Sequence, residues 1–279
     1  MRLSAKLDIL HAHLNIRKPM ALDLVGMIVL LIVAIAPAVG YLIWVRNTET
    51  CHREPYAALI GVMVFGGTFA VAAAVVLETL AQMALFLPGS PLARGFGLFG
   101  PINPTFELLV MAVIIAPVVE ELVKSTGLFT VYGRLNEIED GIIYGAAVGL
   151  GFAVTENVLY FVIAFSQGVD VLFLTIVIRS ITSMVLHLSA SSISGYGISR
   201  ARVLSARGRQ VSWLPYVAIA IVLHAIFNLM ASLGDIFPQN ADVMSLAGLF
   251  LVFVMANAAF AIMRRRVKEL DLSTPCPPR

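Results

Sequence analysis

Ionisable side chains interrupt stretches of this 279-residue chain that are otherwise apolar and long enough to cross a membrane. They are Glu120, Glu121, Lys124, Glu156, His187 and His224, with Asn157 and Asn228 close by and Glu78 alone in an earlier stretch. A charged side chain at the centre of a bilayer costs roughly 2.5–3.5 kcal/mol, so the charges at 120, 121, 124 and 156 would together cost on the order of 10 kcal/mol if unpaired. We therefore expect these groups to be paired, neutralised, hydrated or bound to a metal ion.

The spacing of these residues indicates that they lie at a similar depth in the membrane. Glu120 precedes Glu156 by 36 residues, Glu156 precedes His187 by 31, and His187 precedes His224 by 37. One membrane-spanning helix with a short loop uses about this many residues. If the four helices pack around one another, their carboxylates and imidazoles converge in one buried pocket.

Several of these residues have a plain structural explanation when they are taken alone, although an ion pair of Glu120 with Lys124 leaves Glu121 and Glu156 without partners. Glu120 and Lys124 share a helical face and could form a structural ion pair. Asn228, one turn after His224, could join two helices through a hydrogen bond. Glu78 has no counterpart in the pattern and is expected to be structural or protonated. The occurrence of the whole set at matched positions favours a functional site.

A glycine repeat leads up to Glu156. Gly141, Gly145 and Gly149 recur at every fourth position, and Glu156 follows on nearly the same helical face. Small residues at this spacing let a neighbouring helix approach closely. The Gly195-Tyr196-Gly197 segment could serve the same purpose after His187.

Transmembrane helices are the elements that would carry these side chains. Hydrophobic residues make up 59% of the chain and charged residues 13%, against about 45–50% and about 25% in a soluble domain. Seven apolar stretches are predicted to be helices, because a helix satisfies its own backbone hydrogen bonds in lipid; they are residues 20–44, 56–87, 105–132, 141–165, 171–198, 213–234 and 242–263. The proline-rich segment 88–104 is expected to be a surface loop or a short re-entrant segment.

The fold class that follows is an all-α, polytopic membrane helical bundle of about 7–8 transmembrane helices with a buried polar site between the central helices. A single membrane domain, residues 1–279, is the simplest organisation. It would comprise a polar N-terminal lead at 1–18, a catalytic core at 105–232 and a basic tail at 264–279.

Basic residues predict the orientation, since Lys and Arg concentrate in cytoplasmic loops. The arginines between 200 and 209 and the basic tail predict a cytoplasmic C-terminus, and the aspartate-containing segment 235–242 fits the opposite side. Arg17 and Lys18 also favour a cytoplasmic N-terminus, which seven crossings cannot provide. Either an eighth crossing lies within 56–104, or the orientation preference of these N-terminal basic residues is overridden by the rest of the chain.

At its polar residues the chain resembles the PrsW family of intramembrane proteases, which is related to the type II CAAX prenyl endopeptidases. The likeness covers roughly residues 105–232. Its motifs are, in order, Glu120-Glu121-x-x-Lys124, Asp140-Gly141 with the glycine-rich helix, Phe152-x₃-Glu156-Asn157, Arg179 with His187, and His224-x₃-Asn228. The glutamate pair is a weak signal alone, whereas the ordered set is specific. Many members of the wider superfamily have histidine in place of Glu156, and glutamate is typical of the PrsW branch.

The resemblance implies hydrolysis of a peptide bond in or near the plasma membrane of a bacterium. Glu120 would act as the general base, with Glu121 and Lys124 setting its charge and orientation. Glu156, His187 and His224 would hold or polarise the water, directly or as ligands of a divalent metal such as Zn²⁺. Asn228 would be a further ligand or a donor to the developing oxyanion.

Lipid and a membrane-anchored protein substrate are the expected partners. A net charge of +2 gives no reason to expect nucleic acid. The main alternative is an ion- or proton-coupled transporter built on the same Glu/His cluster, which predicts discontinuous helices and a pathway open to both sides. A membrane scaffold that binds a helix without cleaving it would tolerate the loss of Glu120 and Glu121.

Overall fold

The computed structural model describes residues 22–87, 89–90 and 104–273, and every regular element among them is a helix. Six helical runs are long and apolar enough to cross a membrane. They are α2 (Leu24–Arg46), α3–η1–α4 (Tyr56–Phe65, Gly66–Ala70, Val71–Phe86), α8 (Ile138–Gln167), α9–α10 (Val169–Ile181, Ser183–Ala206), α11 (Leu214–Ala231) and η4–α13 (Pro238–Asn240, Ala241–Asp271). The predicted all-α polytopic membrane bundle is confirmed.

The third predicted stretch is also helical, as α6 (Pro104–Val110), η2 (Met111–Ile115) and α7 (Ala116–Thr130). It differs from the six apolar runs because it carries Glu120, Glu121 and Lys124. The run Tyr56–Phe86 is continuous, so an eighth crossing does not lie there. The polar lead at 1–18, most of the segment 88–104 and the end of the basic tail lie outside the described residues.

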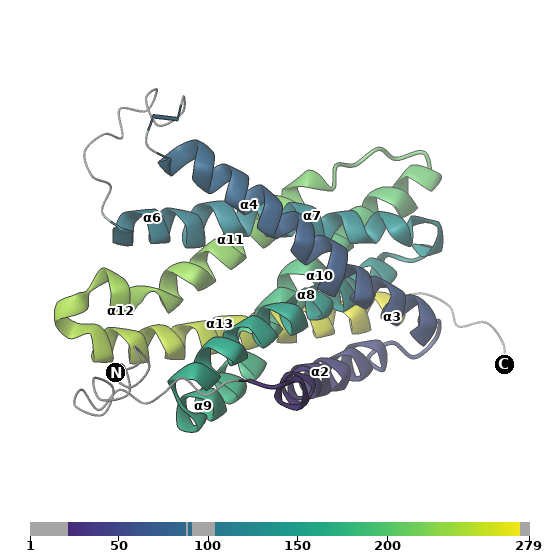
Figure 1. Ribbon diagram of the computed structural model, residues 1–279. Coiled ribbons are helices and arrows are strands. Elements are labelled where there is room, and N and C mark those ends of the chain that lie inside the picture. Colours follow the sequence, from purple (N-terminus) through teal and green to yellow (C-terminus); the bar gives the residue numbers. More distant parts are fainter. Residues whose placement is uncertain (1–21, 88, 91–103, 274–279) are drawn as a thin grey trace, which may run out of the picture.

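Helix α8 lies at the centre of the bundle, against α10 on one face and α2, α3 and η1 on others (Figure 1). A Cβ atom on Gly141, Gly145 or Gly149 would lie only 2.1–2.3 Å from a backbone carbonyl oxygen of α10. The three carbonyls belong to Gly195, Ser191 and His187. The predicted glycine ridge is confirmed, and it fixes the depth of His187 relative to α8.

A short π-helix, η2, precedes the charged part of α7. Each N–H in this register donates to the carbonyl five residues earlier, as Ala116 N does to Met111 O. In the same register the carbonyl of Ala112 would need an N–H from Pro117, which has none. The side chain of Asn228 supplies the missing donor, with its Nδ2 2.7 Å from Ala112 O. This bond ties α11 to the start of α7.

Several connections meet at the end of the bundle where α13 ends, on the right in Figure 1. Thr50 N, between α2 and α3, donates to the carboxylate of Asp271 at 3.1 Å. Arg202 of α10 donates to Leu135 O, between α7 and α8, at 2.7 Å. The short helix α12 (Leu233–Ile236) lies at the opposite end, on the left in Figure 1.

Candidate functional site

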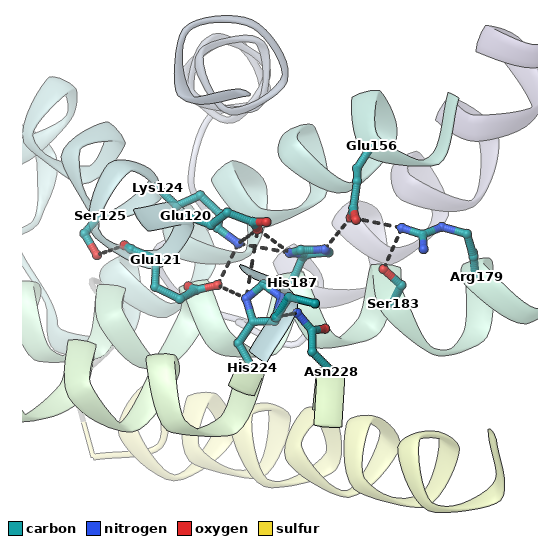
Figure 2. A network of polar contacts seen from close by, with 11 residues as sticks. Glu120, Glu121, Lys124, Ser125, Glu156, Arg179, Ser183, His187, His224 and Asn228 are labelled. Carbon is teal, nitrogen blue, oxygen red and sulfur yellow. Dashed lines mark hydrogen bonds and ion pairs between the residues drawn. The ribbon is translucent and has the colours of Figure 1, made fainter. Parts of the chain in front are cut away.

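Lys124 is the centre of a buried polar cluster (Figure 2). Its Nζ donates to Glu121 Oε1 at 2.6 Å and to Glu120 Oε2 at 3.2 Å, and lies 3.0 Å from His187 Nδ1. The same ammonium lies 4.4 Å from the ring centroid of Phe152. Helical spacing in α7 places Glu120, Glu121 and Lys124 within one turn, so a single cation serves both carboxylates.

His224 of α11 completes this cluster from the other side. Its Nδ1 lies 2.9 Å from Glu121 Oε1 and 4.0 Å from Glu120 Oε2. A carboxylate can only accept, so Nδ1 carries the hydrogen and the lone pair of the neutral ring is on Nε2. The rings of His224 and His187 meet edge to face, with centroids 5.0 Å apart.

Glu156 of α8 is held between a histidine and an arginine. His187 Nε2 lies 2.7 Å from Glu156 Oε2, and an Arg179 guanidinium nitrogen lies 2.9 Å from the same oxygen. Arg179 also donates to Asn157 Oδ1 at 2.7 Å and to Ser183 Oγ at 3.0 Å. Because His187 donates to Glu156 through Nε2, its Nδ1 is left as an acceptor for Lys124.

A cavity of about 350 Å³ opens beside these groups. Its polar lining comprises Glu78, Glu120, Glu156, Tyr160, Arg179, Ser183, His187, His224, Asn228 and Ser232. Glu121 and Lys124 are not among the lining residues, and both are fully buried. Glu120, 8% exposed, is therefore the carboxylate of the glutamate pair that faces the cavity.

Four side chains offer a possible set of metal ligands. One atom from each of Glu120, Glu121, His187 and His224 lies within 4.8 Å of all the others. Glu121 Oε2 is buried and has no hydrogen-bond partner among the described residues. Carboxylate oxygen and imidazole nitrogen are ligands that divalent Zn²⁺ accepts. The cluster therefore fits a metal ion, although Lys124 already supplies one positive charge to the same atoms.

Comparison with known proteins bears on what this cavity does. The family model described as PrsW family intramembrane metalloprotease matches residues 54–259, most of the chain. The chain belongs to the PrsW family. It is 27% identical to the protease PrsW of Clostridioides difficile over 71% of this chain and 77% of the relative. It is 25% identical to protease PrsW of Geobacillus kaustophilus over 70% of this chain and 76% of that relative. No solved structure matches the chain.

Membership of the PrsW family makes this chain a membrane protease, and therefore a hydrolase. Together with its apolar helices, it identifies an integral, multi-pass membrane protein of bacteria. The family is described as one of metalloproteases, which agrees with a Glu/His cluster that can hold a metal ion. The findings give no support to the transporter alternative.

The structure brings the predicted residues of this PrsW protein together. Glu120, Glu156, His187 and His224 come from four helices and meet around one cavity, so the predicted convergence is confirmed. Glu156 lies beyond His187 and is not one of the four mutually close ligands. Asn228 lines the cavity while its amide donates to Ala112 O.

Sequence reasoning missed part of the PrsW site. Arg179, which the motifs pair with His187, lies in the last turn of α9, forms an ion pair with Glu156 and stacks on Tyr160, 3.7 Å from the ring centroid, a partner that the motifs did not indicate. Glu78, which had no counterpart in the pattern, lines the same cavity. Helical spacing could have indicated Tyr160, four residues after Glu156, and Ser183, four before His187.

Proposed function

We propose that this PrsW family member hydrolyses a peptide bond of a membrane-anchored protein, with Glu120 as the general base. The observation that carries the proposal is the position of Glu120, at the border between the charged cluster and the cavity. A general base must reach the proton of the attacking water, and Glu121 is fully buried behind Lys124 and His224. Glu120 would take that proton and pass it to the leaving amine.

Lys124 and Glu121 would position the base in this proposal. Lys124 donates to both carboxylates, so it limits how far Glu120 can turn. Glu121 holds the ring of His224 through Nδ1 and leaves Nε2 without its hydrogen. Of the side chains on the cavity wall, we assign Asn228 to the developing oxyanion as a hydrogen-bond donor, and His224 to a metal ion through its lone pair.

A bound Zn²⁺ would be held by Glu121, His187 and His224 in this scheme, leaving Glu120 free as the base. When bound, such an ion lowers the pKa of a water and polarises the scissile carbonyl. Glu156 would not contact the ion in this scheme. Its hydrogen bond with His187 Nε2 would instead orient the ring of that ligand. This assignment replaces Glu156 by Glu121 in the ligand set expected from the sequence.

Charge supports a cation in this cluster. Glu120, Glu121 and Glu156 are matched by Lys124 and Arg179 among the described contacts, which leaves one negative charge in excess. An uncompensated charge in a membrane-spanning region is costly. A proton or a divalent metal would offset it.

The test is cleavage of a membrane-anchored candidate substrate by purified protein, combined with metal analysis. Glu120→Gln should lower the rate by about 10²–10⁴-fold, the usual contribution of a general base, with metal content unchanged. Glu121→Gln and His224→Ala should lower both the rate and the metal content. Glu107→Gln, at a half-buried glutamate on α6 of the same run that does not line the cavity, is the matched control and should cleave normally. Wild-type cleavage by Glu120→Gln would refute the proposal.

We further propose that the protein lies in the bacterial plasma membrane with its C-terminus in the cytoplasm. Arginines gather at the end of the bundle where α13 ends, among them Arg46, Arg134, Arg202 and Arg264. The connection at the other end, residues 232–240, contains Asp235 and no Lys or Arg. Basic residues near span ends are retained on the cytoplasmic side.

A further inference from the structure

A second group of acidic side chains lies at the arginine-rich end of the bundle, away from the cavity. Its members are Glu49 and Glu54 from the α2–α3 connection, Glu137, Glu139 and Asp140 from the start of α8, and Asp271 from the end of α13. All except Glu137 are buried. Three elements distant in sequence therefore bring six carboxyl groups into one region.

Glu49 is the unexplained member of this group. Its side chain is fully buried, and neither carboxylate oxygen has a hydrogen-bond partner among the described residues. One of these oxygens lies within 4.8 Å of ligand oxygens of Glu137 and Asp140. Burial, followed by the repulsion of Glu54, Glu139, Asp271 and Glu137, raises the pKa of Glu49 to about 8. A carboxylate in this setting calls for a cation or a proton.

Other members of the group already have partners that hold them in place. Asp140 Oδ2 accepts from the backbone N–H groups of Asn136 and Glu137 at 2.7 and 2.8 Å. Tyr144 donates to Glu54. These bonds fix the carboxylates in position, so they do not depend on an ion for their placement.

Positive charge near the group is scarce. His52 Nδ1 lies 3.1 Å from Glu137 Oε1. Among the described residues, no Lys or Arg forms an ion pair with any of the six carboxylates, although several arginines are close in the fold. Within the described part of the chain, His52 is thus the one basic side chain in an ion pair with this acidic group.

We infer that Glu49, Glu137 and Asp140 bind a divalent cation of the oxygen-preferring class, Ca²⁺, Mg²⁺ or Mn²⁺. Carboxylates alone, without histidine or cysteine, favour these hard ions over Zn²⁺. Ca²⁺–oxygen distances of about 2.3–2.6 Å place two ligands of one ion at most about 5 Å apart, and the ligand oxygens of these three residues all lie within 4.8 Å of one another. The ion would join the α2–α3 connection to the start of α8.

Such a site would act on stability rather than on the chemistry of the cavity. Glu137 caps α8, and the same helix carries Glu156 nineteen residues further along. A cation binding only the folded state raises the melting temperature by mass action. At a concentration about 100 times its Kd, the increase should be about 5 °C for a chain of this size.

In the experiment, the purified full-length protein in detergent is first stripped of metal with a chelator. It is then titrated with Mn²⁺, and binding is followed by electron paramagnetic resonance. The titration is done in a Glu121→Gln/His224→Ala background, which removes two of the cavity ligands, and in the wild type. Both should bind Mn²⁺, and competition with Ca²⁺ or Mg²⁺ identifies the preferred ion. Glu49→Gln should weaken binding by at least about tenfold, since even outer-shell partners contribute 10–100-fold.

Asp170→Asn, an exposed aspartate in the first turn of α9, is the matched control and should bind like its parent. Glu137→Gln is the second test variant, in case Glu49→Gln does not fold. Melting temperatures with and without cation provide an independent readout, and the increase should vanish in Glu49→Gln. Unchanged Mn²⁺ affinity in the Glu49 and Glu137 variants would overturn the inference, and so would the absence of binding in the Glu121→Gln/His224→Ala background. Neither result would contradict the proposed protease activity.

Discussion

Lys124 makes the glutamate pair tolerable inside the membrane. Its ammonium is fully buried, and it contacts Glu120 and Glu121 from its own helix and His187 from α10. Removing one partner of a buried ion pair costs about 3–5 kcal/mol, because the other charge is left uncompensated. The lysine is therefore needed for the fold of the site as well as for its charge.

Substitution of Lys124 tests this coupling. Lys124→Met should lower the free energy of unfolding by about 3–5 kcal/mol and abolish cleavage. The double variant Lys124→Met/Glu121→Gln should recover part of the stability, since it also removes the stranded charge. Unfolding in mixed micelles, analysed as a double-mutant cycle, measures the interaction. Strictly additive effects of the two substitutions would show that the pair is not coupled.

At the residue scale, spacing predicted which groups meet but not how they pair. Similar intervals along the chain predicted that Glu156, His187 and His224 lie at one depth, and all three line the same cavity. The partner of each side chain depends on helix rotation and rotamer, which spacing does not encode. Glu156 was for this reason expected to be a ligand, whereas in the structure it bridges His187 and Arg179.

At the scale of elements, close packing of α8 on α10 sets the geometry of the site. A Cβ on Gly149 would come 2.2 Å from His187 O, a distance that requires the backbones to separate. His187 contacts both Lys124 and Glu156, so any movement of α10 alters the whole cluster. The glycine repeat was readable from the sequence because its four-residue period is visible without tertiary information.

Gly149→Ala should therefore disturb both stability and activity. We expect a loss of about 1–3 kcal/mol, typical of an overpacked contact, and a clear loss of cleavage. Gly61→Ala is the matched control, because a Cβ on this helical glycine of α3 would meet nothing within 4 Å. It should be neutral or more stable by up to about 1 kcal/mol. Equal effects of the two substitutions would contradict the packing argument.

The hydrogen bond between Asn228 and the π-helix η2 offers a second test at this scale. Asn228→Ala leaves the Ala112 carbonyl unpaired and should cost about 1–3 kcal/mol. Pro117→Ala restores a backbone N–H close to that carbonyl, so the double variant should regain part of the lost stability. Thermal unfolding of the two single variants and the double variant checks this. If Pro117→Ala does not compensate, Asn228 does not serve as the replacement for the N–H that Pro117 lacks.

The π-helices could not be predicted from the sequence. Hydropathy indicates that residues 105–132 form a helix, but the five-residue register of η2 arises from Pro117 together with a donor on another helix. The acidic group around Glu49 was missed for a related reason. Its members come from the α2–α3 connection, the start of α8 and the end of α13, and whether these meet depends on how the whole bundle packs.

At the scale of the whole molecule, charge is distributed unevenly between the two ends of the bundle. Arginines of α10 and α13 lie at one end, where Arg202 and Arg264 bond to the α7–α8 connection and to Thr48. The acidic group around Glu49 lies at the same end, but Asp and Glu contribute little to membrane orientation. The basic residues should therefore decide which end remains in the cytoplasm.

Protease access to sealed membranes tests this orientation. Arg207 and Arg209 are exposed in the connection between α10 and α11, whereas Gln239 is exposed at the opposite end. Trypsin should cleave at the two arginines in inverted vesicles and leave them intact in spheroplasts. A Gln239→Arg variant adds a site at the other end, which should be cleaved only in spheroplasts. Cleavage of both sites from one side would be incompatible with a bundle that crosses the membrane between them, and the reverse pattern would place the C-terminus outside.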